Sequence, residues 1–431
     1  MTFFLRIFYT LCILLLLPYI FVRLWWKGRK LTPYRQDWAE RLGIVPIPKL
    51  EGSLWLHAVS VGEAIAAVPL IRKFRLEQPN TPIVITTMTP TGRERVRSAF
   101  KEELNQSIFN VYVPYDVPFF IKRLLNHIKP TLFVAMETEI WPNLFNQMQK
   151  HQIPIMIANG RLSPKSAKWY QRFGRFMRDL LKAVHVIAAQ SPKDAESFVK
   201  IGLDEAKVLT TGNIKFDFEL NPLHLKEGAL LKKQLNAEMV WIAASTHRTE
   251  EAIVLEVFSD LKKIFPSLVL LLVPRHPDRF NEVAELCHKS GFKTHRRSEG
   301  PLQDSVDIYL GDTMGEMFVF YAASDIAFVG GSFAPIGGHN LLEPAALHLP
   351  VLTGPHLFNF AKITELLVNA DGVMIVQDKQ ELTEKLKMLL HSDNRRHLMG
   401  ERAHGVVLEN RGALDKMLQI ILRLWHPKPA F

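Results

Sequence analysis

The chain has 431 residues, and 48% of them are hydrophobic, which is enough apolar material for two separate cores. Its 53 lysines and arginines outnumber its 43 aspartates and glutamates, and the resulting net charge of +10 favours anionic partners. The only cysteines are Cys12 and Cys287, which excludes a disulfide framework or a cysteine-based zinc site and fits a reducing compartment for the main body.

The first thirty residues differ in character from the rest. Residues 7–22 carry no charge, and a basic, tryptophan-rich stretch follows at residues 23–30. This pattern predicts a membrane-anchor helix over residues 1–30, with the chain after it on the cytoplasmic side by the positive-inside rule. A cleaved signal peptide is a poorer match, because the positive charge lies mainly after the apolar run. Arg6 and Pro18 leave open a helix that lies at the membrane surface.

Short apolar runs alternate with amphipathic helical stretches from Ser53 onward, which is typical of an α/β fold with parallel sheets. In the first unit we expect strands near residues 54–59, 83–87, 110–113, 132–135, 155–158 and 184–188. In the second we expect strands near 240–244, 268–273, 306–310, 326–329 and 351–352. The polar stretch 219–238 separates the two series and predicts domains over 31–218 and 219–431, with a last helix that is able to pack back on the first domain.

Ligands of open parallel sheets lie at the carboxyl ends of the strands, so the loops there are the places to look for chemistry. Glu63 follows the first predicted strand, on the first turn of a helix over residues 64–74. The helix dipole favours its ionised form, which suits a general base. First-turn glutamates also commonly do no more than complement the dipole, so the sequence leaves both interpretations open.

Two carboxylates, Glu137 and Glu139, end the strand at 132–135, and an extended backbone would place both on one face. They are candidates for acid and base work or for stabilising a positive transition state, although solvated loop charge is the simpler explanation. Lys215 closes the first unit and is a candidate anion contact.

Three loops of the second unit suit an anion. Arg275 and His276 lie between two prolines, which hold a cationic pair on a stiff backbone. Met314 and Gly315 follow the strand at 306–310, where amides at a helix start are able to cradle a phosphate.

The third loop combines two glycine pairs with a histidine, an asparagine and a glutamate, from Gly330 to Glu343. Glycine pairs let the backbone approach a nucleotide, and Glu343 is able to accept hydrogen bonds from both ribose hydroxyls. A glycine-rich loop alone is a weak signal, but this combination after a strand predicts a nucleotide site.

Six motifs resemble those of the Kdo transferases of lipopolysaccharide assembly, which transfer 3-deoxy-D-manno-octulosonic acid (Kdo). They are His57-Ala-Val-Ser-Val-Gly-Glu63, Thr86-Thr-Met-Thr-Pro-Thr-Gly92, Met136-Glu-Thr-Glu-Ile-Trp-Pro-Asn143, Pro274-Arg-His-Pro277, Asp312-Thr-Met-Gly-Glu316 and Gly337-Gly-His-Asn-Leu-Leu-Glu343. The basic, tryptophan-rich edge of the N-terminal anchor is similar too, so the resemblance covers essentially the whole chain.

The resemblance implies a GT-B fold, in which two Rossmann-like domains face each other across a cleft, with an N-terminal membrane-anchor helix. It places the acceptor on the first domain and the nucleotide sugar on the second. It makes Glu63 the general base and Glu137 and Lys215 the stabilisers of the transition state. The implied site for cytidine monophosphate (CMP) consists of Arg275, His276, Met314, Gly315, Glu316, Asn340, Leu341, Leu342 and Glu343.

The implied reaction moves Kdo from CMP-Kdo to the lipid A precursor lipid IVA with inversion, without a metal or other cofactor. The expected partners are CMP-Kdo, lipid IVA and anionic lipids of the bacterial inner membrane, and no nucleic acid. Two alternatives remain from the residues alone. One is a nucleotide-sugar epimerase of GT-B architecture, which the anchor disfavours, and the other is a non-catalytic membrane-bound glycolipid-binding protein.

Overall fold

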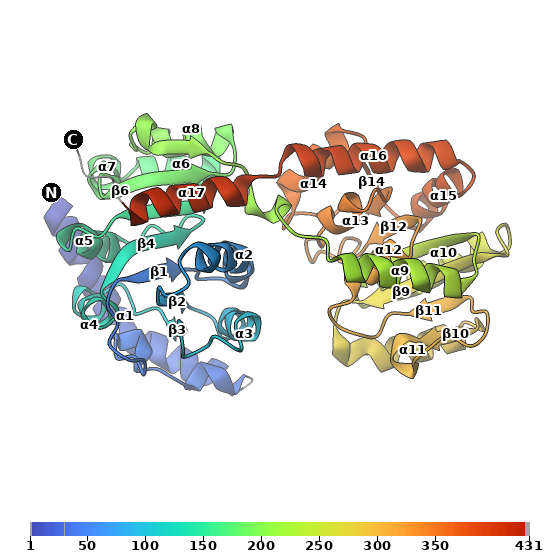
Figure 1. Cartoon of the computed structure of the whole chain (residues 1–431), viewed down its shortest axis with the longest axis horizontal. Helices are drawn as coiled ribbons and strands as arrows, with labels where there is room; N and C mark the ends of the chain where they lie inside the picture. The colour runs from blue at the N-terminus through green and yellow to red at the C-terminus, as the bar shows by residue number, and fades with distance from the viewer. Residues whose placement is uncertain (1, 30, 427–431) are drawn as a thin grey trace. The chain divides into compact units, whose positions relative to one another are not determined.

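The chain forms two compact units (Figure 1). The computed structural model describes residues 2–29 and 31–426. Unit 1 comprises Met1–Phe218 and Arg411–Phe431, and unit 2 comprises Glu219–Asn410. The sequence predicted a second domain over 219–431 with a last helix able to pack back on the first domain, and that helix, α17 (Ala413–Trp425), packs in unit 1. Both carboxylate oxygens of Asp217 accept hydrogen bonds at the start of this helix, from the backbone of Gly412 and Leu414 at 2.6 Å each.

Unit 1 contains a seven-stranded parallel sheet in the order β3-β2-β1-β4-β5-β6-β7. Its strands are β1 (Ser53–His57), β2 (Ile83–Thr87), β3 (Ile108–Tyr112), β4 (Pro130–Met136), β5 (Ile155–Gly160), β6 (Val184–Ala189) and β7 (Val208–Thr210). The central strand β1 is buried over its whole length, because helices cover both faces of the sheet. The strand order reverses between β1 and β4, which defines the switch point where ligands bind in such sheets.

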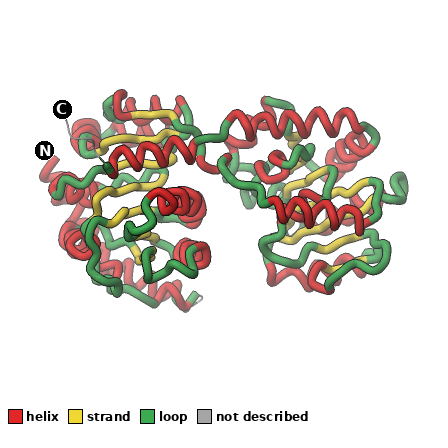
Figure 2. The backbone as a smooth tube through the Cα atoms, in the orientation of Figure 1, coloured by secondary structure: helices red, strands yellow, loops and turns green. Residues whose placement is uncertain are grey.

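Nine α-helices of the described residues belong to unit 1, and most of them connect successive strands of this sheet (Figure 2). They are α1 (Thr2–Lys27), α2 (Val61–Glu77), α3 (Pro90–Ala99), α4 (Pro118–Ile128), α5 (Pro142–Lys150), α6 (Pro164–Gln171), α7 (Gly174–Leu181), α8 (Pro192–Lys200) and α17. Proline occupies the first position of five of them, α3, α4, α5, α6 and α8, and also of α9 (Pro222–Leu235) in unit 2. A proline there has no amide to leave unpaired, so it marks where a helix begins.

Unit 2 contains a second seven-stranded parallel sheet, in the order β10-β11-β9-β8-β12-β13-β14. Its strands are β8 (Met239–Thr246), β9 (Leu268–Pro274), β10 (Thr294–Arg296), β11 (Ile308–Leu310), β12 (Ile326–Val329), β13 (Val351–Thr353) and β14 (Val373–Ile375). Its helices are α9, α10 (Glu250–Lys262), α11 (Phe280–Lys289), α12 (Met317–Ala322), α13 (Leu342–Ala346), α14 (Ala361–Asn369), α15 (Lys379–Leu390) and α16 (Asp393–Glu409). Here the switch point lies between β8 and β12.

Two parallel sheets, each covered by helices, confirm the predicted α/β class. Every strand predicted from the sequence is present, with ends that differ by a few residues. Three strands were missed, namely β7, β10 and β14, and all three lie at an edge of their sheet.

The N-terminal helix α1 is the one helix of the described residues that is long and apolar enough to cross a membrane, over Phe3–Lys27. This agrees with the predicted anchor, although Met1 and Lys30 of that segment lie outside the described residues.

Candidate active site

Glu63 lies at the carboxyl edge of the first sheet, where β1 leads into α2. Ser60 caps α2 by accepting a hydrogen bond from the Glu63 amide at 3.2 Å. The carboxylate of Glu63 turns back and accepts from the Ser60 hydroxyl and from the Val59 amide, both at 2.7 Å. This reciprocal pattern is a variant of the capping box, so the carboxylate has a fixed orientation.

Burial is the main reason that the pKa of Glu63 is raised from 4.5 to about 7, because the side chain is only 6% exposed. The hydrogen bond from Ser60 opposes this rise, and the negative charges of Glu139 and Glu137 add to it. A carboxylate whose pKa lies near neutrality accepts a proton more readily than an ordinary glutamate does. The fold thus places a basic carboxylate beside the switch point of the sheet.

The two carboxylates after β4 lie near Glu63, and their charges act on it. Glu137 has a left-handed backbone with φ of 55°, and its amide donates to the Ala158 carbonyl at 2.9 Å. The Glu139 carboxylate accepts from the Trp141 indole at 2.7 Å, and burial raises its pKa. Since the backbone turns at Glu137, the two side chains do not follow the simple extended geometry that we assumed from the sequence.

Lys215 lies at the same edge of the sheet, in the short 3-10 helix η4 (Ile214–Phe216). Asn213 caps this turn by accepting from the Lys215 amide at 3.0 Å. The buried side chain of Asn159, at the end of β5, accepts from the Ile214 amide at 3.1 Å. The strand β5 pairs with β4. The contact from Asn159 therefore holds the turn of Lys215 one strand away from the loop of Glu137.

In unit 2, one carboxylate organises the glycine-rich loop at the switch point. Glu250 is fully buried and accepts four backbone hydrogen bonds. Its Oε2 accepts from His247 at 2.9 Å and Gly331 at 2.7 Å, and its Oε1 accepts from Ser332 and Phe333 at 2.9 Å each. Glu250 therefore joins the loop after β8 to the loop after β12.

The glycines of this loop are required by close contacts. A Cβ at Gly330 would lie 2.8 Å from Oε2 of Glu250, and one at Gly331 would lie 2.7 Å from the His339 ring. Gly331 also has a φ of 67°, which side chains other than glycine rarely adopt.

Three histidines and Arg275 gather beside this loop. His247 and His339 are joined by a hydrogen bond of 2.8 Å between their Nε2 atoms, and the His276 ring centroid lies 5.0 Å from that of His247. Burial, and then the neighbouring positive groups, lower the pKa of His339 to about 4. The charge of Arg275 acts on both His339 and Glu343.

Glu343 is tied to Asn340, whose side-chain amide donates to it at 3.1 Å, and burial raises its pKa. Asn340 in turn accepts from the Leu342 amide at 3.1 Å, so it fixes the start of α13. The structure thus brings together Arg275, His276, Asn340 and Glu343 of the predicted nucleotide site, and Leu341 and Leu342 are buried next to them.

The loop from Met314 to Glu316 follows β11, two strands away from β8. Met314 is exposed, and Gly315 has a φ of 88°. The Glu316 carboxylate is held by Arg297, with 2.6 Å between Nη2 and Oε1, and accepts from the Thr313 hydroxyl. These contacts lower its pKa, so Glu316 stays ionised and shapes its loop.

Three residues that organise these loops, Ser60, His247 and Glu250, were not among the site residues predicted from the sequence. The spacing of Ser60 and Glu63 is that of a capping box, so the contact between them was predictable from the sequence. Glu250 gave no comparable signal, because three of its four amide partners, Gly331, Ser332 and Phe333, lie about eighty residues away in the chain.

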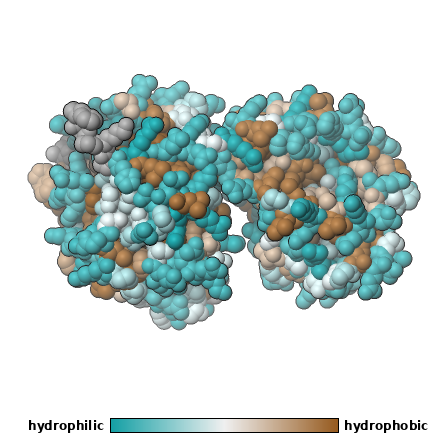
Figure 3. All heavy atoms as spheres, viewed as in Figure 1, coloured by the Kyte–Doolittle hydropathy of each residue, from teal (hydrophilic) through white to brown (hydrophobic). Residues whose placement is uncertain are grey.

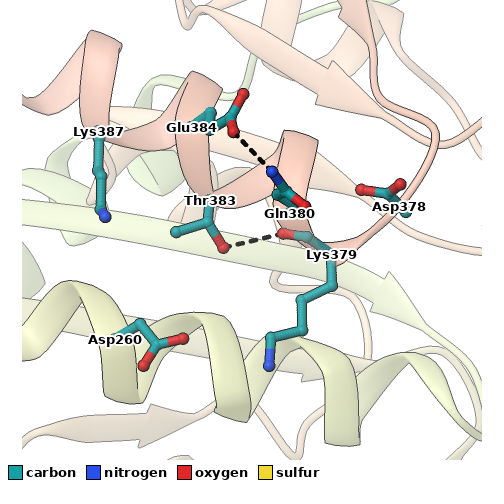
Figure 4. A pocket seen from close by; sticks show the side chains of 7 residues that line it. All are labelled: Asp260, Asp378, Lys379, Gln380, Thr383, Glu384 and Lys387. Carbon is teal, nitrogen blue, oxygen red and sulfur yellow. Dashed lines mark hydrogen bonds between the residues drawn. The ribbon is translucent and has the colours of Figure 1, made fainter.

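A hollow between α10 and α15 contains none of the predicted site residues (Figure 4). It is lined by Asp260, Asp378, Lys379, Gln380, Thr383, Glu384 and Lys387. Several of its charged side chains form ion pairs or hydrogen bonds with one another or with nearby residues. In one of these pairs, Nζ of Lys379 lies 2.7 Å from Oε2 of Glu256.

Comparisons with known proteins show the family of the chain. Residues 36–218 match the family described as 3-deoxy-D-manno-octulosonic-acid transferase (kdotransferase). The 3-deoxy-D-manno-octulosonic acid transferase of Haemophilus influenzae is 41% identical over 422 residues, which cover 96% of this chain and 98% of that one.

The solved structures with this fold are more distant. A glycosyltransferase from Rickettsia africae matches 88% of this chain and 100% of its own with a TM-score of 0.56 at 16% identity. A putative UDP-N-acetylglucosamine 2-epimerase from Listeria monocytogenes matches 88% and 97%, with a TM-score of 0.53 at 15% identity. The fold alone is therefore shared by transferases and epimerases, whereas the sequence identity extends along nearly the whole of a Kdo transferase. The chain belongs to the Kdo transferase family of glycosyltransferases.

Proposed function

We propose that this glycosyltransferase moves Kdo from CMP-Kdo to the lipid A precursor lipid IVA, with inversion at the anomeric carbon. Glu63 takes the proton of an acceptor hydroxyl, the oxygen attacks the anomeric carbon, and the bond from that carbon to the phosphate of CMP breaks. A single displacement of this kind inverts the configuration.

One observation carries this proposal: the carboxylate of Glu63 is buried at the switch point of the first sheet and oriented by Ser60 and Val59, and this burial raises its pKa to about 7. A base with that pKa is partly ionised at neutral pH and holds the proton after it has taken it. Glu137 and Lys215, from loops at the same sheet edge, are the proposed stabilisers of the transition state. The choice of Glu137 over Glu139 rests on the family pattern, and the bond from Trp141 to Glu139 is consistent with it.

The donor site proposed for unit 2 consists of Arg275, His276, Met314 to Glu316 and Asn340 to Glu343. Arg275 supplies positive charge for the phosphate, the ring of His276 is able to donate a hydrogen bond to it, and Glu343 supplies acceptors for the ribose hydroxyls. Preorganised cations and amides are sufficient to stabilise a departing monophosphate, so the proposal needs no metal or organic cofactor.

The proposed location is the bacterial inner membrane, with α1 as the anchor and the two units on the cytoplasmic side. A net charge of +10 supports a place beside anionic lipids and an anionic glycolipid acceptor.

Mixing the full-length protein with CMP-Kdo and tetra-acylated lipid IVA tests the proposal. We expect release of CMP together with a lipid product whose mass, by mass spectrometry, is larger by one or more Kdo units. We also expect NMR of this product to show that the anomeric configuration of Kdo is inverted relative to CMP-Kdo. CMP release without a Kdo-bearing lipid would contradict the proposed acceptor. Retention of the anomeric configuration would contradict the proposed single displacement.

A further inference from the structure

One stripe of α1 packs against unit 1 along most of the helix. Its partly buried residues recur at helical spacing, at Arg6, Tyr9, Ile13, Leu17, Phe21 and Leu24. The α1 helix contacts α5, α7 and the short helix η1 (Thr32–Arg35). The anchor is therefore part of the packing of unit 1 rather than a separate extension.

Specific contacts fix this packing. The Tyr9 hydroxyl hydrogen-bonds the buried carboxylate of Asp116, and the Asn143 amide donates to the Thr10 hydroxyl at 2.9 Å. Further along, the Phe21 ring lies 5.2 Å from the ring of Trp38. The polar pairs have directional partners that are themselves buried in unit 1.

The opposite stripe of α1 is apolar and exposed. It consists of Phe4, Phe8, Leu11, Leu15, Val22 and Trp26, each at least half exposed. On the face that Figure 3 shows, apolar residues are interspersed with hydrophilic ones. A continuous apolar stripe of this length on a helix marks a surface that meets lipid.

Basic and aromatic side chains lie at the end of the helix. The guanidinium groups of Arg29 and Arg35 lie 4.7 and 4.9 Å from the Trp25 ring. Tryptophan and arginine together suit the headgroup layer of an anionic membrane.

These contacts do not fit a helix that crosses the bilayer. With the basic end at one surface, Tyr9 would lie about 27 Å further along the helix, close to the far side of a hydrocarbon layer about 30 Å thick. Asp116 and Asn143 would have to lie there too, with the α/β body around them.

We propose that α1 lies in the plane of one leaflet, with its exposed stripe in the acyl chains and its other stripe docked on unit 1. The N-terminus and the body are then on the same side of the membrane. This inference goes beyond the proposed function, since either topology would allow the reaction.

Labelling with a membrane-impermeant maleimide tests the topology in the full-length protein. One variant carries a cysteine in a short hydrophilic N-terminal extension, and another carries Leu76→Cys on the exposed surface of α2. Both contain Cys12→Ser, and Cys287 is buried. We expect both cysteines to react in the same preparation, either spheroplasts or inverted vesicles. Reaction in opposite preparations would overturn the proposal.

Cross-linking in native membranes tests the docking. We expect Thr10→Cys with Asn143→Cys to be joined by a short bifunctional reagent, whereas Leu15→Cys with Asn143→Cys is not, because Leu15 is 80% exposed on the other stripe. If the first pair does not cross-link, or if both pairs cross-link equally, α1 is not docked on unit 1 when the protein is in the membrane.

Discussion

Replacement of Glu63 by glutamine separates its proposed catalytic role from its structural one. The amide preserves the cap, because its oxygen is able to accept from Val59 while its NH2 group donates to the Ser60 hydroxyl, at the positions of the present 2.7 Å contacts. We therefore expect the variant to fold and to bind CMP as the parent does. The loss of the base should slow transfer roughly 100-fold or more.

The same substitution has a predictable effect on stability. A rise of the pKa from 4.5 to about 7 corresponds to roughly 3 kcal/mol that opposes ionisation of Glu63 in the folded chain. Between these two pH values the folded state binds more protons than the unfolded state, so this group makes the parent less stable as the pH rises. Glutamine does not titrate. Relative to the parent, the variant should therefore gain up to about 3 kcal/mol between pH 4.5 and pH 7.

Transfer rates from CMP release, and unfolding in urea across this pH range, measure both effects on one sample. The parent rate should also fall below pH 7 as Glu63 becomes protonated. Near-normal transfer by the variant would remove Glu63 from the mechanism. A stability difference that does not change with pH would show that the carboxylate is not the buried, basic group described above.

Three further predictions, one with a control substitution, concern unit 2. Glu343→Gln should weaken CMP binding, measured by calorimetry, about tenfold, which is the effect of losing one charge-assisted hydrogen bond. Unchanged affinity would contradict the proposed contact of Glu343 with the ribose. Glu250→Ala leaves four buried amides without their acceptor and should lower the free energy of unfolding by about 3 kcal/mol or more, whereas Glu256→Ala on the exposed side of α10 should cost under about 1 kcal/mol. His339→Gln should weaken CMP binding with little change in melting temperature, and an equal loss of both would indicate a purely structural residue.

The fold class followed from the sequence because the central strands are buried on both faces and read as continuous apolar runs, as in β9 and β12. The edge strands did not show this pattern. An edge strand pairs on one side only, so β10 consists of half-buried Thr294, His295 and Arg296, and β7 is largely exposed. Their pairing depends on neighbouring strands and not on their own composition.

The candidate site divides in a similar way. The position of Glu63 was predictable, because a strand, a glycine and a first-turn glutamate are adjacent in the sequence. Its pKa was not, since this depends on burial and on the charges of Glu139 and Glu137 from another strand. Glu250 shows the same limit, because its partners Gly331 to Phe333 come from a distant loop.

The cap of α2 also determines where a transferred proton is able to reside. The Ser60 hydroxyl donates to Oε1 of the ionised Glu63, while the Val59 amide donates to Oε2. Once Oε1 carries a proton, rotation of the Ser60 hydroxyl turns the same contact into one that Ser60 accepts. Both protonation states of Glu63 thus keep two hydrogen bonds without a movement of any heavy atom. In the proposed mechanism, the proton that Glu63 takes from the acceptor is therefore held at the first turn of α2 with no rearrangement of that turn.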